Sequence, residues 1–502
     1  MPHPIDESFT ALPLRALADA ALSAATAAGA SFADFRYHRV QAGVLTVRDT
    51  AVQANTDAVT TGYAVRVIAD GTWGFASSVL ATPEAAAGTA RQAVAVARAL
   101  AGVVSERVER ADEPVYRDAT WVSEYEVDPF TVPATDKIGL LLHRSERLLA
   151  ADGVSHTVAS LQAAKENTFY ADTAGTVTTQ QRVRVQPELE AVAVDTGSGS
   201  FETMKSLVPP AGRGWEYVAT GWDFDAEIGV IAGTLAEKLK APSVRAGAYD
   251  LVIDPSNLFL TIHESIGHAT EYDRAIGYEA AYAGTSFATP DQLGTLQYGS
   301  PVMHVTGDRT AVHGLATVGY DDDGVAAQSW DLVRDGVLVG YQLDRVFARK
   351  LGLPRSNGCA YADSPGHIPI QRMANVSLQP DPAGGSTEDL IAGVDDGIYV
   401  VGDKSWSIDM QRYNFQFTGQ RFYRIRNGKL DGQLRDVAYQ ATTTDFWGAM
   451  DAVGGPDTYV LGGAFNCGKG QPGQVAAVSH GCPSARFRGI NVLNAREEGG
   501  AA

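Results

Sequence analysis

Cysteine is scarce in this chain, and long apolar runs are absent from it. Three cysteines in 502 residues are too few for a disulfide framework, so we expect reduced thiols. No stretch approaches the roughly 18 continuous apolar residues of a membrane-spanning helix. The first residues also lack a basic segment followed by an apolar run. The sequence therefore predicts no membrane partner and no signal peptide, and we expect a cytoplasmic protein.

Basic residues are also fewer than acidic residues. The chain has 40 Lys and Arg residues against 59 Asp and Glu residues, a net charge of −19. Sequence-independent binding to nucleic acid or to an anionic membrane needs a basic face. We therefore expect no nucleic-acid partner. The length of 502 residues suffices for two or three domains with more than one core.

Helical and strand patterns are mixed in the first part of the chain. Residues 13–29 predict an Ala-rich helix, and a second helix should start behind Thr82, which is followed by Pro83. Residues 134–151 predict a third helix. Asp70-Gly71 predicts a hairpin turn between two short strands.

Strand patterns dominate the second part, where the dipeptides Asp335-Gly336, Asp396-Gly397, Asn427-Gly428 and Asp431-Gly432 predict further hairpins. We therefore expect an α+β fold with an N-terminal α/β domain and a β-rich C-terminal domain. The expected division is residues 1–208 for the α/β domain with its β-rich extension, 209–240 for a linker and helix, and 241–502 for the β-rich catalytic domain with its metal-binding helix.

The most informative motif is His263-Glu264-Ser265-Ile266-Gly267-His268, a His-Glu-x-x-x-His pattern. Imidazole is a common zinc ligand, and a carboxylate beside such a ligand is well placed to take a proton from an activated water. The pattern therefore predicts a metal-dependent hydrolase.

The spacing of the two histidines sets a geometric condition. Residues five apart on an ideal α-helix point about 140° away from each other. Both imidazoles can reach one ion only if the helix is widened by a π-type step or ends between them. We expect such a step near Ile266 and Gly267.

A catalytic zinc usually has three protein ligands and one open position. The Gly-rich segment around Cys467 favours that thiol as the third ligand, and Cys482 is its rival. If both thiols bound, His263, His268, Cys467 and Cys482 would form a closed structural site that has no use for Glu264.

Segments in order along nearly the whole chain resemble the TldD/PmbA family of metallopeptidases, in particular the TldD-type subunit. They include GYAVRVIADGTWGFAS, HESIGHATEYDRA, GYDDDGVAAQ, HIPIQRMANVSLQPD, FYRIRNGKL and NCGKGQPGQ. The resemblance implies one Zn²⁺ per chain, with His263, His268 and Cys467 as ligands and Glu264 as general base. It also implies a dimer, either with itself or with a paralogue that lacks the metal motif.

Two further polar residues, His367 and Arg372, fall in one of the matching segments. They are candidates for binding the substrate, and Arg372 would suit a carboxylate. An arginine that pairs with one of the many acids of the chain is an equally good interpretation.

The predicted function is hydrolysis of peptide bonds in short or unfolded peptides. Two alternatives remain open: a non-catalytic binding subunit that zinc stabilises, and a metallohydrolase of a small amide. Glu264 separates the first alternative from the enzyme, because only catalysis needs that carboxylate.

Overall fold

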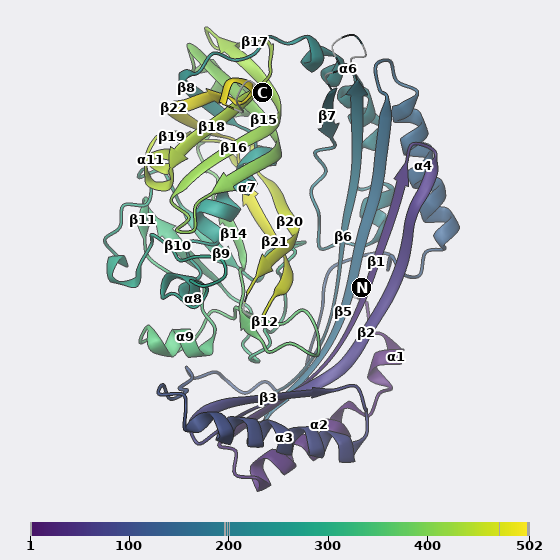
Figure 1. Cartoon of the computed structure of the whole chain (residues 1–502), viewed down its shortest axis with the longest axis vertical. Helices are drawn as coiled ribbons and strands as arrows, with labels where there is room; N and C mark the ends of the chain where they lie inside the picture. Colours follow the sequence, from purple (N-terminus) through teal and green to yellow (C-terminus); the bar gives the residue numbers. More distant parts are fainter. Residues whose placement is uncertain (1–2, 195–196, 198, 200, 471, 499–502) are drawn as a thin grey trace.

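The two halves of the chain have different architectures and lie side by side (Figure 1). The computed structural model describes residues 3–194, 197, 199, 201–470 and 472–498. The first half is a sheet of very long strands with helices packed on it, and the second half is rich in shorter strands. This arrangement confirms the expected α+β fold.

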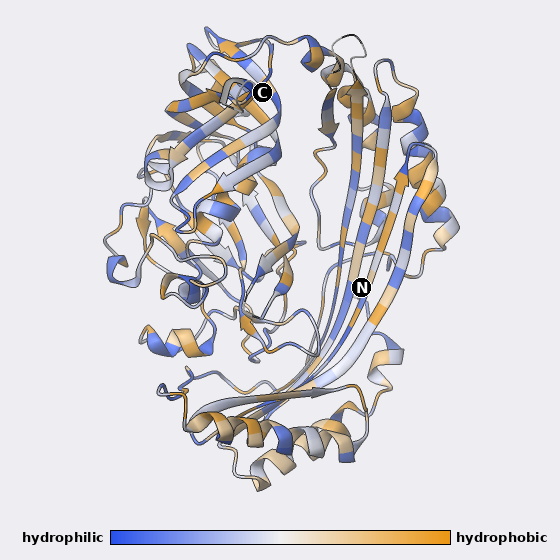
Figure 2. Ribbon diagram, viewed as in Figure 1, coloured by the Kyte–Doolittle hydropathy of each residue, from blue (hydrophilic) through white to orange (hydrophobic). Residues whose placement is uncertain are grey.

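Four antiparallel strands of 17 to 19 residues dominate the N-terminal sheet. The strand order is β3-β2-β1-β5-β6-β4, with β7 also paired to β6. Apolar and polar bands alternate along β5 and β6 (Figure 2), as the two-residue period of a strand requires. The bounds are β1 Phe32–Arg48, β2 Ala51–Ala69, β3 Thr72–Ser78, β4 Ala119–Val122, β5 His156–Asp172, β6 Val177–Val194 and β7 Phe201–Lys205.

Helices cover this sheet in two places. α2 and α3 pack on β1, β2 and β3 through buried alanines, whose small side chains allow close approach. α4 and α6 pack with β5, β6 and β7 around a second core. The Thr82 hydroxyl accepts from the N–H of Ala85, which confirms the predicted cap. The bounds are α1 Glu7–Thr10, α2 Leu14–Ala27, α3 Pro83–Ala101, α4 Ala134–Leu149, α5 Trp215–Ala219 and α6 Phe224–Lys240.

The C-terminal half contains a closed barrel. β15, β8, β22, β18 and β16 pair in that order, and the pairing of β16 with β15 closes the ring. β8 and β15 are parallel, and the other pairs are antiparallel. The strands of this sheet are β8 Gly247–Ile253, β15 Asp396–Ile408, β16 Asn414–Arg426, β17 Lys429–Leu434, β18 Val437–Thr442, β19 Met450–Val453 and β22 Ala485–Asn494.

The remaining elements surround a helix, α7, that follows β8. A hairpin of β20 and β21 and a small sheet of order β11-β10-β9-β14 flank it. The strands are β9 Val305–Asp308, β10 Ser329–Arg334, β11 Val337–Leu338, β12 Ala360–Tyr361, β13 Ile370–Gln371, β14 Asn375–Leu378, β20 Val460–Lys469 and β21 Gln474–Cys482. The helices are α7 Pro255–Ile262, η1 His263–Gly267, α8 Tyr272–Ala275, η2 Pro290–Gln292, α9 Arg345–Lys350, α10 Thr387–Ala392, α11 Thr443–Gly448, η3 Pro456–Thr458 and α12 Ala495–Glu498.

The predicted hairpin turns are confirmed in three places and wrong in two. Asp70-Gly71, Asp335-Gly336 and Asn427-Gly428 adopt the positive φ values of tight turns between paired strands. Asp396-Gly397 instead lies inside β15, where a Cβ on Gly397 would lie 2.4 Å from the Asp250 carbonyl oxygen of β8. Asp431-Gly432 lies within β17, at an irregularity in its register with β16.

Buried charges join the two halves. Arg36 of β1 pairs with Asp322, and Arg66 of β2 pairs with Asp323, so strands of the first half are bonded to a loop of the second. α6 packs on the N-terminal sheet, although the predicted domain boundaries remain a prediction. Within the described ranges, no helix is both long and apolar enough to cross a membrane.

Candidate metal centre

The helix that carries the His-Glu motif changes its hydrogen-bond pattern at the first histidine. α7 begins behind Asp254, whose side chain accepts from the N–H of Ser256. The chain then continues as a π-helical turn, η1, in which the N–H of His268 donates to the carbonyl of His263 over 3.0 Å. Hydrogen bonding between residues five apart widens the turn. The predicted π-type step is therefore confirmed.

The packing around this turn explains the glycine in the motif. A Cβ on Gly267 would lie 2.6 Å from Sδ of Met373 and 3.5 Å from the ring of His480. The thioether of Met373 thus occupies the space that a side chain at residue 267 would need. Any side chain here would force the end of Met373 to move.

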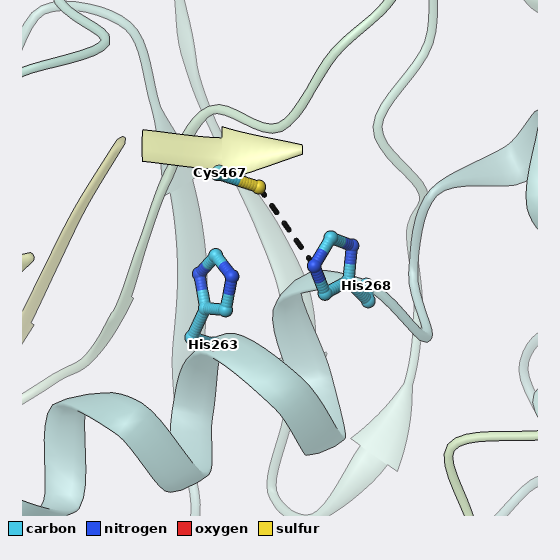
Figure 3. Close-up of side chains that lie close together, drawn as sticks. All are labelled: His263, His268 and Cys467. Atoms are coloured by element: carbon cyan, nitrogen blue, oxygen red, sulfur yellow. Dashed lines mark hydrogen bonds between the residues drawn. The ribbon is translucent and has the colours of Figure 1, made fainter. Parts of the chain in front are cut away.

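Three donor side chains meet over the π-helical turn. The ligand atoms of His263, His268 and Cys467 all lie within 4.8 Å of one another, and all three residues are buried. Figure 3 shows both rings rising from the helix and the thiol reaching toward them from β20. Sγ of Cys467 lies 3.8 Å from Nε2 of His268. Two imidazoles and one thiol suit zinc, and three ligands leave one position open, as in catalytic sites.

Cys482 takes no part in this group. Its thiol donates to the carbonyl of Pro255 at 3.7 Å, and the donor group found among the described residues does not include it. A closed site of two histidines and two cysteines is therefore not assembled. Burial raises the pKa of the Cys467 thiol to about 11, and Arg372 opposes the rise. A cation bound at this sulfur would displace its proton.

His263 is oriented by a neutral chain of hydrogen bonds. The backbone carbonyl of Val376 can only accept, so Nδ1 of His480 donates to it over 2.9 Å. Burial lowers the pKa of His480 to about 4, so its Nε2 carries a lone pair and accepts from Nδ1 of His263 over 2.7 Å. Nε2 of His263 is left unprotonated, which is the form that binds a metal.

His268 is oriented by a buried carboxylate instead. Its Nδ1 donates to Oε2 of Glu271 over 2.8 Å, which leaves Nε2 for a metal. Oε1 of Glu271 accepts from the ammonium of Lys469 over 2.9 Å. Although burial opposes ionisation, Lys469 and His268 hold the pKa of Glu271 well below its usual range. The other members of this charge cluster are Asp273, Arg274 and Glu279.

Glu264, the predicted general base, is buried beside the metal group and paired with an arginine. Its Oε2 accepts from Nη1 of Arg412 over 2.6 Å. Burial raises the pKa of Glu264, while Arg412 and a hydrogen bond from Trp406 lower it. The positive charge of Arg412 also lowers the pKa of His263 and of His268, after the larger effect of burial. Arg412 therefore lies close enough to Glu264, His263 and His268 to influence the charge of each.

The two residues suggested for substrate binding lie in different settings. Nδ1 of His367 is 2.6 Å from Oδ1 of Asp363, and its side chain is partly exposed. Arg372 is only 1% exposed, and its Nη2 donates to the carbonyl of Cys467 over 2.6 Å. The guanidinium thus supports the strand that carries the thiol. A role in substrate binding remains a prediction for both residues.

Sequence reasoning missed four polar residues of the site: His480, Glu271, Lys469 and Arg412. Glu271 and Lys469 lie within recognised segments, but no local pattern pairs them or His480 with the motif histidines. Arg412 belongs to none of the recognised motifs. Glu271 is three residues from its partner His268. The other three residues reach the site through contacts between elements far apart in the chain.

Comparisons with known proteins cover both halves of the chain. Residues 33–97 match a model described as PmbA/TldA metallopeptidase domain 1, and residues 246–494 match the PmbA/TldA metallopeptidase C-terminal domain. A metalloprotease of Methanothermobacter thermautotrophicus is 29% identical over 92% of this chain and 95% of its own length. A zinc metalloprotease TldD homolog of Saccharolobus solfataricus is 23% identical over 92% of this chain and 97% of its own length.

Solved structures share the fold. A putative modulator of a DNA gyrase from Thermotoga maritima superposes with a TM-score of 0.75 at 16% identity, covering 95% of this chain and 99% of that one. TldE from Thermococcus kodakarensis superposes with a TM-score of 0.69 at 14% identity, covering 94% and 98%. Because two models of one family match in order and together span more than half of the sequence, the chain belongs to the TldD/PmbA family of metallopeptidases and is a metalloprotease.

Proposed function

We propose that this chain is a zinc peptidase that binds one Zn²⁺ through His263, His268 and Cys467 and uses Glu264 as general base. The observation that carries the proposal is the meeting of three buried donors over a π-helical turn that also bears the carboxylate. A zinc ion held there would supply Lewis-acid chemistry, which makes water a nucleophile at neutral pH and polarises a carbonyl oxygen.

Glu264 has the chemistry of a proton carrier in this setting. It is buried, so few solvent molecules compete for its proton, and burial raises its pKa above that of an exposed carboxyl group. The carboxylate accepts a proton from the attacking water and passes it to the nitrogen of the leaving amine. A backbone amide nitrogen is a poor leaving group without that proton, so the same residue serves both steps.

A cleft between the two halves reaches residues that neighbour this site. It has a volume of about 330 Å³ and runs along β20 on one wall and along β5 and β6 on the other. Its lining includes Trp406, whose side chain is bonded to Glu264, and Asn466, the neighbour of Cys467. Asn466 also donates to Gln162 of β5 across the cleft over 3.2 Å.

The shape of this cleft favours an extended peptide as substrate. An extended chain can add as a strand to an exposed sheet edge, with main-chain hydrogen bonds that demand little of its sequence. Folded proteins offer no such strand, because their backbone groups are already paired. We therefore propose short or unfolded peptides as substrates. Cleavage of one polypeptide in folded and denatured forms tests this, and equal rates would contradict it.

The decisive experiment separates binding of the metal from chemistry. Glu264→Gln should retain about one zinc per chain and lose peptidase activity, because glutamine cannot take a proton from water. His263→Ala should lose both zinc and activity. Metal analysis and a peptide cleavage assay on the same samples give the answer. If Glu264→Gln keeps most of its turnover, the general-base assignment is wrong.

A dimer remains part of the proposal and rests on the family resemblance. Two subunits, identical or paralogous, would enclose the cleft and restrict it further to flexible chains. Light scattering on the purified protein, alone and with a motif-lacking paralogue, measures the assembly. A fully active monomer would contradict an enclosed site.

A further inference from the structure

Arg412 sits in the tip of the hairpin between β15 and β16 in a strained backbone conformation. Its φ is +63°, a left-handed value that disfavours a long side chain. Such outliers are destabilising and gather at functional sites. The tip is held by Asp409, whose side chain accepts from three backbone N–H groups, and by Thr443, whose hydroxyl donates to the Arg412 carbonyl over 2.7 Å.

The hairpin tip is also bonded to the loop that follows the metal-binding helix. The N–H of Thr285 donates to the carbonyl of Met410 over 2.8 Å, and that of Phe287 donates to Gln411 over 2.9 Å. A Cβ on Gly284 would lie 2.0 Å from the Met410 oxygen, so the two segments are in tight contact. These two backbone hydrogen bonds fix the position of the hairpin tip and therefore of the Arg412 backbone.

The guanidinium of Arg412 has hydrogen-bonding capacity that the protein does not use. Its side chain is 14% exposed, and Nη1 donates to Oε2 of Glu264. Its Nε is buried without a hydrogen-bond partner in the described part of the chain. A buried donor left without an acceptor is destabilising, and a fork of N–H groups matches a developing negative oxygen. The structure thus presents an unused donor beside the proposed base.

We propose that Arg412 is a catalytic residue whose guanidinium stabilises the negative charge that develops on the scissile carbonyl oxygen. This inference rests on the proposed peptidase function. The water oxygen bonds to the carbonyl carbon, the π electrons of the carbonyl move onto its oxygen, and Glu264 takes a proton from the water. The C–N bond then breaks, the electron pair on oxygen re-forms the carbonyl, and the proton passes from Glu264 to the amine nitrogen.

The pairing with Glu264 explains how one arginine serves both states. Before reaction the negative charge beside Arg412 is on the carboxylate. When Glu264 takes the proton it becomes neutral, and the negative charge appears on the carbonyl oxygen. The guanidinium can therefore shift its hydrogen bonds from one oxygen to the other while remaining paired with an anion. Such an interaction strengthens in the transition state, which is the condition for catalysis.

The test compares Arg412→Gly and Arg412→Lys with the unchanged protein. Glycine removes the side chain and tolerates the positive φ, whereas lysine keeps the charge and loses the fork. Zinc content should stay close to that of the parent for both, whereas Tm should fall in Arg412→Gly, because Glu264 loses its buried partner. For Arg412→Gly, kcat should fall by about 10²–10³-fold with KM nearly unchanged. Arg412→Lys should recover part of the loss.

A phosphinic peptide, which mimics the tetrahedral anion, makes the test specific. Its affinity should fall in Arg412→Gly by the same factor as kcat/KM, because both measure transition-state binding. Gln411→Ala, in the same hairpin tip with an exposed side chain, is the control and should change neither quantity.

Two results would overturn the proposal. One is full activity in Arg412→Gly, or in Arg412→Lys if the glycine variant does not fold. The other is a loss of kcat with unchanged phosphinate affinity, which would mean that Arg412 only positions Glu264. The Glu264→Gln variant, assayed alongside, keeps this failure distinct from a failure of the proposed function, since only the latter leaves Glu264→Gln active.

Discussion

The two histidines of the metal group are held in place by opposite kinds of surroundings. Behind His263 lies a neutral chain of hydrogen bonds that runs through His480 to a backbone carbonyl. Behind His268 lies a buried cluster in which Glu271, Asp273 and Glu279 face the cations Lys469 and Arg274. Both arrangements leave Nε2 free for a metal, so the same geometric result is reached by a neutral and by an ionic route.

The difference matters for what each side tolerates. Removing one member of a buried ionic cluster leaves an uncompensated charge in a medium of low dielectric constant. Removing one member of a neutral chain leaves only an unpaired polar group, which costs less. We therefore expect the His268 side to determine the stability of the fold around the site, and the His263 side mainly to tune metal affinity.

The largest effect should follow from Lys469→Met. Its ammonium binds Glu271 and Asp273 at 2.9 and 2.8 Å and is 1% exposed. Without it, three buried carboxylates face a single cation, and we expect the free energy of unfolding to fall by about 3–5 kcal/mol. Urea denaturation followed by tryptophan fluorescence measures the change.

A matched control is Lys350→Met, at a lysine that pairs with the largely exposed Glu106. Exposed ion pairs contribute about 0–1 kcal/mol, so this variant should unfold almost like the parent. Equal losses in the two variants would mean that the buried cluster is not a special source of stability.

The next effect concerns the third ligand, which enters on the same strand as Lys469. Cys467→Ser should weaken zinc binding by more than the roughly 10–100-fold that is typical of residues behind a ligand. Cys482→Ser should leave zinc content unchanged, because that thiol is bonded to the carbonyl of Pro255 and does not belong to the metal group. Zinc per chain after dialysis against a chelator compares the two. Equal metal loss would contradict the assignment of Cys467.

The motif residues of the site could be predicted from the sequence because they lie close together along the chain. His263, Glu264 and His268 lie within six residues, and the five-residue spacing of the histidines requires either a π-type step or a helix end, of which the structure shows the first. Cys467 lies 199 residues beyond His268, so only its Gly-rich segment and the family resemblance could favour it over Cys482. His480 and Lys469 could not be assigned, because their partners are set by how the β20–β21 hairpin packs on the helix.

The fold shows the same limit. The turn dipeptides predict hairpins correctly where the strands on both sides pair with each other. At Asp396-Gly397 the prediction is wrong, because the glycine has a different role there. It allows the parallel approach of β8, a contact within the barrel between segments about 150 residues apart. The length of β2 could not be predicted from the sequence either. Residues 51–61 of this strand are mostly polar and exposed, and they lack the alternation of a half-buried strand.

A smaller effect should follow from His480→Leu. Leucine fills similar space but cannot accept from Nδ1 of His263, so nothing fixes which ring nitrogen carries the proton. We expect zinc affinity to fall by about 10–100-fold, with a smaller change in stability than Lys469→Met causes. Competition with a colorimetric chelator at constant pH measures the affinity. An unchanged zinc affinity would mean that His480 is not needed to orient His263.

The sharpest comparison comes from placing glutamine behind each histidine, and His480→Gln should give the smallest effect of all. In His480→Gln the amide oxygen can still accept from His263, so zinc-binding free energy should change by less than about 1 kcal/mol. In Glu271→Gln an amide oxygen can likewise accept from His268, but the hydrogen bond to a charged group is lost, and about 1.5–3 kcal/mol should be lost with it. Chelator competition on both variants gives the two numbers under one condition. If the two substitutions weaken zinc binding equally, the charge on Glu271 contributes nothing beyond orientation, and the ionic and neutral sides of the metal group are equivalent.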